Sequence, residues 1–81
     1  MKVTTGIGGL TITFEDGKFA GRTYDMGGDG LTKKDGHGFW VHIDTMRQIE
    51  PYEHWLTEEE RTEIIEEMKK NSDKFPFELE F

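Results

Sequence analysis

Cysteine is absent from this sequence, and serine occurs only once, at Ser72. Without cysteine there can be no disulfide, no thiolate nucleophile and no thiolate metal ligand. Ser72 falls at the end of an expected helix, and no Ser-His-Asp arrangement can be assembled around it. No apolar run approaches the roughly 18 residues of a membrane-spanning helix, and residues 1–9 lack the apolar stretch of a signal peptide. These absences predict a non-catalytic protein of the cytoplasm.

The residue spacings that hold metals, phosphates and cofactors are also missing. His37, His42 and His54 show no ligand spacing relative to one another. Residues 25–30 hold two acids, but they lack the D-x-D-x-D-G spacing and the terminal Glu of a calcium loop. Gly6–Gly9 is not followed by the Lys-Ser or Lys-Thr of a phosphate-binding loop. We therefore expect no catalytic residue, no metal site and no cofactor.

Negative charge is present in excess, and all of the excess lies in the second part of the chain. The formal net charge is −7 at pH 7. Residues 1–49 carry six acids and six bases, whereas residues 50–81 carry eleven acids and four bases. Such a polarised surface repels nucleic acid and anionic membrane and attracts basic partners.

The chain of 81 residues is expected to form one domain, residues 1–81, with a modest core. Leu10–Phe14 is apolar at every second position, which predicts a strand with one buried face. Asp16-Gly17 predicts a hairpin turn, because glycine accepts the positive φ that such turns need. A second strand is then expected over residues 18–24.

The middle of the sequence is rich in glycine. Asp25–Gly38 holds five glycines in 14 residues and is predicted to be a long loop, which in so small a domain is either functional or mobile. Phe39–Ile43 alternates again and predicts a third strand with residues 39, 41 and 43 on one face. Residues 45–55, interrupted by Pro51, are expected to be irregular.

Leu56–Ser72 contains the clearest predicted element, a helix that Thr57 can cap. Thr57 and Glu60 have the spacing of a capping box, in which two orphan backbone N–H groups are satisfied reciprocally. Glutamates crowd the first turn and lysines the last, as the helix dipole favours. The apolar stripe on one face consists of Ile64, Ile65 and Met68.

A last strand is predicted over Phe75–Phe81, because its odd positions are all apolar. The order β-β-β-α-β predicts an α+β fold, with a small antiparallel sheet and one C-terminal amphipathic helix packed on one face. The expected core consists of Leu10, Ile12, Phe14, Val41, Ile43, Ile64, Ile65, Met68, Phe77 and Leu79.

The face of this helix opposite the apolar stripe is acidic. The like-charged pairs Glu59/Glu63 and Glu63/Glu67 lie one turn apart, and each such pair destabilises a helix by about 0.2–0.5 kcal/mol. Either this face only keeps the protein soluble, or it is a docking surface for a basic partner. The candidate partner-binding residues are the acids of this helix and of the Gly-rich segment: Glu59, Glu63, Glu66, Glu67, Asp25, Asp29 and Asp35.

Four segments together resemble a group of small immunity proteins from bacterial toxin–immunity systems, the polymorphic-toxin and contact-dependent-inhibition systems. The segments are Phe39–Arg47, Glu50–Glu53, Leu56–Glu60 and the pair Ile64-Ile65. The sequence departs from the family pattern at Ile49, where the pattern has Trp, and in its longer Gly-rich segment. The resemblance implies a protein that binds a cognate toxin domain and blocks it.

The sequence leaves three functions open. The first is an immunity-type protein that neutralises a basic toxin domain by stoichiometric occlusion. The second is a non-catalytic interaction module of another bacterial assembly, including a homodimer joined through an exposed sheet edge. The third, an enzyme, would need a cleft that this length hardly provides. A protein partner is expected, and neither nucleic acid nor membrane.

Overall fold

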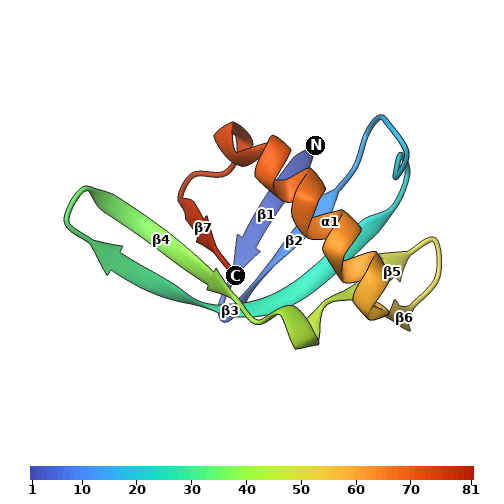
Figure 1. The fold of residues 1–81 in the computed structure, drawn as a ribbon, viewed down its shortest axis with the longest axis horizontal. Coiled ribbons are helices and arrows are strands. Elements are labelled where there is room, and N and C mark those ends of the chain that lie inside the picture. Colours follow the sequence, from blue (N-terminus) through green and yellow to red (C-terminus); the bar gives the residue numbers. More distant parts are fainter.

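The computed structural model describes residues 1–81 as a seven-stranded sheet with one α-helix. The elements are β1 (Lys2–Gly6), β2 (Gly9–Thr13), β3 (Thr23–Lys33), β4 (Gly36–Val41), β5 (Arg47–Glu50), β6 (His54–Trp55), α1 (Glu58–Lys70) and β7 (Glu78–Glu80). The strands follow the spatial order β1-β2-β3-β4-β7, and β5 pairs with β3 and β6. Helix α1 crosses one face of the sheet (Figure 1). The predicted α+β fold with one C-terminal helix is confirmed, with more strands than the sequence indicated.

Strand β3 is the centre of the sheet. Its first part, Thr23–Gly27, pairs with β2 on one side and, over Thr23–Asp25, with β5 on the other. Its second part, Gly28–Lys33, pairs with β4. The resulting β3–β4 hairpin projects away from the rest of the sheet (Figure 1). One strand therefore joins two groups of strands that otherwise have few contacts.

The prediction that Asp25–Gly38 is a loop is wrong. The segment forms most of β3 and the start of β4, with only a short turn at Lys34-Asp35. Gly28 permits close approach between β3 and β4. At Gly28 an added Cβ would lie 2.3 Å from the Trp40 carbonyl oxygen and 2.5 Å from the Phe39 ring. Gly28 is therefore needed for packing, whereas an added Cβ at Gly30 would meet nothing within 4 Å, and neither glycine marks a break in the strand.

The connection between β2 and β3 also differs from the expected tight hairpin. Residues 18–22 are not a strand: the ladder begins at Thr23, and a longer loop closes where the Phe14 N–H donates to the Arg22 carbonyl at 3.0 Å. Gly17 and Gly21 both have positive φ. The loop turns Phe19 back into the core, where its ring centroid lies 5.6 Å from that of Phe14.

Residues 45–55, expected to be irregular, contain a second small hairpin made of β5 and β6. Arg47 lies opposite Trp55 and Gln48 opposite His54. Gln48 is buried, and its side-chain amide donates to the Tyr52 carbonyl at 2.9 Å, which satisfies the polar group and ties the hairpin together.

Helix α1 has the predicted start and orientation. The Thr57 hydroxyl accepts the Glu60 N–H at 3.2 Å, and the Glu60 carboxylate accepts the Thr57 N–H at 3.1 Å, so the capping box is present. Ile64 and Met68 are buried, and Ile65 is half-buried. The apolar stripe therefore faces the sheet.

The core has 13 buried apolar residues and includes most of the predicted ones. Ile65, Phe77 and Leu79 pack against its rim. Ile43 does not belong to it: β4 ends at Val41, and a 3₁₀ turn over Ile43–Thr45 leaves Ile43 40% exposed. The core residues that were not predicted are Phe19, Tyr24, Met26, Phe39, Met46, Leu56 and Phe75.

Strand β7 is shorter than expected and pairs with β4 in parallel. Glu78, Leu79 and Glu80 lie opposite residues 38, 39 and 40 of β4. A 3₁₀ turn over Ser72–Lys74 and a bend precede it, so the ordered ladder begins only two residues after Pro76. This pair is the one parallel neighbour in a sheet whose other ladders are antiparallel.

Candidate protein-interaction surface

The outer face of α1 carries the acids that the sequence placed there. Glu59, Glu63 and Glu66 are exposed, and Glu59 and Glu66 form no ion pair. Glu63 lies 3.2 Å from the Lys18 ammonium and Glu67 lies 3.4 Å from that of Lys70, both in exposed pairs. Because solvent screens such pairs, they contribute little stability and are easily exchanged for contacts with another molecule.

Glu60 differs from its neighbours because both of its carboxylate oxygens are used inside the protein. One oxygen accepts the Thr57 N–H, and the other lies 3.0 Å from His54 Nε2, which donates to it. The hydrogen bond from His54, followed by that from Thr57, lowers the pKa of Glu60 from its ordinary value. This carboxylate fixes the start of α1 to β6 and is a structural residue.

Two large aromatic side chains are exposed beside the start of α1. Tyr52 is 66% exposed and Trp55 is 67% exposed. They belong to the β5–β6 hairpin, which lies at the same end of the molecule as the N-terminal end of α1 (Figure 1). Segment 50–59 therefore presents two aromatic rings, with the four exposed carboxylates Glu50, Glu53, Glu58 and Glu59 in the same stretch of chain.

The structure does not bring the predicted aspartates together with the acids of the helix. Asp25 alternates along β3 with buried Tyr24 and Met26, so it lies on the sheet face away from α1, where Arg47 Nη2 is 3.2 Å from it. Asp29, in the part of β3 that pairs with β4, lies 3.0 Å from Nε2 of His42, the residue after the end of β4. Asp35 is exposed in the β3–β4 turn. The seven candidate residues thus fall on two separate surfaces.

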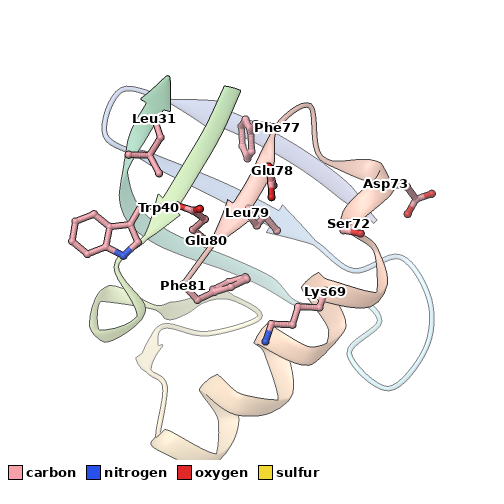
Figure 2. Close-up of a pocket in the computed structure, with 10 residues that line it drawn as sticks. All are labelled: Leu31, Trp40, Lys69, Ser72, Asp73, Phe77, Glu78, Leu79, Glu80 and Phe81. Atoms are coloured by element: carbon pink, nitrogen blue, oxygen red, sulfur yellow. The ribbon is translucent and has the colours of Figure 1, made fainter. Parts of the chain in front are cut away.

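Sequence reasoning missed the exposed aromatics and the largest groove. The groove has a volume of about 1110 Å³, runs along β7 and contains none of the seven candidate residues. Phe77, Leu79 and Phe81 line it (Figure 2). The alternation of these residues was the available signal, but it was interpreted only as a buried strand face. Tyr52 and Trp55 gave no signal, because aromatic residues are usually at least partly buried.

The remaining chemistry-bearing residues do not converge. No three histidine, aspartate or glutamate side chains gather in a way that could hold a metal ion. His37 is exposed near the β3–β4 turn, whereas His42 and His54 each contact one carboxylate. None of the helices has the length and apolar character needed to cross a membrane.

Comparisons of the chain with protein-family models, with curated proteins and with solved structures found no match.

Proposed function

We propose that the protein is an immunity-type inhibitor that binds a basic toxin domain stoichiometrically and occludes it. The proposed contact surface is the outer face of α1 together with segment 50–59. The observation that carries the proposal is a set of exposed carboxylates without ion-pair partners, Glu58, Glu59 and Glu66, beside two exposed aromatic rings.

The unpaired carboxylates suit a basic partner for a physical reason. Like-charged groups one turn apart repel, as do Glu59 and Glu63, and each pair costs the free helix about 0.2–0.5 kcal/mol. Arginine or lysine side chains of a partner relieve that repulsion on binding. The same field accelerates encounter, because electrostatic complementarity acts mainly on the association rate.

Tyr52 and Trp55 would supply apolar binding energy, which charge alone does not provide. Tyrosine and tryptophan are enriched among the few residues that carry most of the energy at protein interfaces. Their ring faces also attract arginine and lysine cations. Carboxylates around such rings therefore favour a basic protein surface over an acidic or purely apolar one.

The test is a binding experiment with the C-terminal domain of the protein whose gene lies immediately upstream, measured by stopped-flow association and by dissociation. In the triple variant Glu59→Gln, Glu63→Gln, Glu66→Gln, the proposal predicts slower association and little change in dissociation. Raising the salt from about 0.1 M to about 1 M shortens the Debye length from about 10 Å to about 3 Å and should slow the wild type more than the variant.

The matched control removes the same number of charges elsewhere, in the variant Glu15→Gln, Asp16→Asn, Asp44→Asn. It should associate at nearly the wild-type rate. A second variant, Tyr52→Ala with Trp55→Ala, should accelerate dissociation. If the triple helix variant binds at the wild-type rate while Asp29→Asn with Asp35→Asn abolishes binding, the contact surface is the β3–β4 hairpin and the proposal is wrong.

A further inference from the structure

Strand β7 lies at an open edge of the sheet. It is the last strand in the order β1-β2-β3-β4-β7, and β4 is its only neighbour. In a strand, alternate backbone groups face the two sides, so part of the N–H and C=O groups of β7 face away from β4. An open edge of this kind is a template for pairing with another extended chain.

The groove along β7 has an apolar wall on one side of the strand. Phe77, Leu79 and Phe81 are all half-buried, and the Phe77 ring stacks on Phe39 with centroids 5.2 Å apart. The Lys69 ammonium lies 5.8 Å from the Phe81 ring. Figure 2 shows Leu31 and Trp40 on one side of β7 and Ser72 and Asp73 on the other. A groove of about 1110 Å³ has room for side chains of an added strand.

The opposite side of β7 is acidic. Glu78 and Glu80 alternate with the apolar residues, and both contact Lys33, at 3.3 Å and 2.6 Å. Two carboxylates thus share one ammonium group, and a negative charge remains along this side. An added strand with basic residues at alternate positions would complement it, because opposite charges on neighbouring strands stabilise pairing.

The same charges disfavour a second copy of this chain as the occupant. In an antiparallel pairing of two β7 strands centred on Leu79, Glu78 of each copy would lie opposite Glu80 of the other. Like charges directly opposite one another destabilise a strand pair. The other open edge of the sheet, at β1, has no comparable apolar wall. Lys2, Thr4 and Thr5 are exposed there, and the one large apolar residue of β1, Val3, packs against the core.

We propose that the open edge of β7 is a strand-addition site for an extended segment of a partner protein in which Lys or Arg alternates with apolar residues. The basic residues would face Glu78 and Glu80, and the apolar residues would face Phe77, Leu79 and Phe81. This site is separate from the outer face of α1, so it stands or falls independently of the proposed inhibitor function.

The probe is an acetylated and amidated heptapeptide of alternating Lys and Val, titrated into the full chain labelled with ¹⁵N. The expected result is saturable binding with slowed amide exchange within residues 78–81. The peptide with Glu in place of Lys should not bind. The peptide methylated at every backbone nitrogen should not bind either, because it keeps the side chains but cannot donate ladder hydrogen bonds.

Two variants of the protein test the two sides of the strand. Glu78→Gln with Glu80→Gln should weaken peptide binding by about twofold to thirtyfold, which corresponds to about 0.4–2 kcal/mol for the loss of two cross-strand charge pairs. Phe81→Ser should weaken it by removing part of the apolar wall without altering β7 itself. The matched control, Glu15→Gln with Asp16→Asn, removes two exposed charges from the β2–β3 connection and should leave peptide binding unchanged.

Several results would overturn the proposal. Equal binding of the methylated peptide would show capture by side chains without strand pairing. Slowed exchange at Thr4 and Thr5 would place the added strand at β1. Concentration-dependent dimerisation in sedimentation, with residues 78–81 protected in the absence of peptide, would make a second copy the occupant.

Discussion

Glu59 and Glu60 are adjacent residues at the start of α1 with different environments. Glu59 is exposed and makes no ion pair, whereas Glu60 accepts hydrogen bonds from Thr57 and His54. One side chain is free for an outside partner, and the other connects two elements of the fold. Identical residues in a run of glutamates therefore have different roles, which only their neighbours distinguish.

The first prediction concerns the pH dependence that Glu60 confers. Its pKa is lower in the folded protein than the ordinary 4.5, mainly because of the hydrogen bond from His54. The unfolded chain therefore binds a proton more readily in acid, so the stabilisation is complete above about pH 4.5 and is lost as the pH falls through the lowered folded value. In urea unfolding, the stability difference between wild type and Glu60→Gln should shrink between pH 7 and pH 3. Glu59→Gln is the control and should show a much smaller pH-dependent difference.

A second prediction separates two neighbouring isoleucines. Ile64 is 1% exposed, whereas Ile65 is half-buried at the rim of the core. Ile64→Ala should cost about 2–5 kcal/mol of unfolding free energy, the range for truncation of buried aliphatic side chains. Ile65→Ala should cost clearly less in the same denaturation experiment. Equal costs would mean that the helix is rotated about its axis from the described position.

At the scale of elements, glycines decide where the β3–β4 hairpin can form. An added Cβ at Gly28 meets the Trp40 backbone and the Phe39 ring, whereas one at Gly30 meets nothing within 4 Å. Gly28→Ala should destabilise the protein by about 1–3 kcal/mol, as overpacking does. Gly30→Ala should be neutral or stabilising by up to about 1 kcal/mol, because alanine loses less backbone entropy in a strand. Thermal unfolding of both variants checks this prediction, and equal effects would contradict the hairpin packing.

The elements differ in how well the sequence predicts them. Helix α1 was predicted with its cap and its buried face, because a capping box and a 3.6-residue period are local signals. Most of strand β3, from Asp25 onward, falls in the segment that the sequence predicts to be a loop, because the requirement for glycine at position 28 arises from Phe39 and Trp40, which are distant in sequence. The interpretation of Gly27, Gly28 and Gly30 as breakers followed their usual role in turns.

The candidate surfaces also divide into features that local sequence predicts and features that depend on tertiary pairing. The exposed acids of α1 followed from the helical period alone. The exposure of Tyr52 and Trp55 depends on the β5–β6 hairpin, which the sequence did not reveal. The groove along β7 depends on the parallel pairing with β4, across about 40 residues of chain. Local period predicts which side of an element is polar, but tertiary pairing decides which edge remains open.

For the whole molecule, the uneven charge predicts how stability responds to salt. The net charge of −7 and the unpaired Glu59 and Glu66 make self-repulsion the main long-range term. Added salt screens it, so the melting temperature should rise by about 2–5 °C up to about 0.5 M NaCl, corresponding to somewhat under 1 kcal/mol. Glu59→Gln with Glu66→Gln should melt higher at low salt and respond less to salt. A fall in melting temperature with salt would mean that surface ion pairs such as Lys18–Glu63 dominate.

The central position of β3 has a consequence for cutting the chain in two. A break at the exposed Lys34-Asp35 turn leaves β3 in one fragment and both β4 and β5, with which it pairs, in the other. Neither fragment can complete the sheet, so each should remain unfolded alone and the two should fold on meeting. Attached to two proteins that associate, the halves would report that association by complementation, and the exposed turn places the fusion points away from α1.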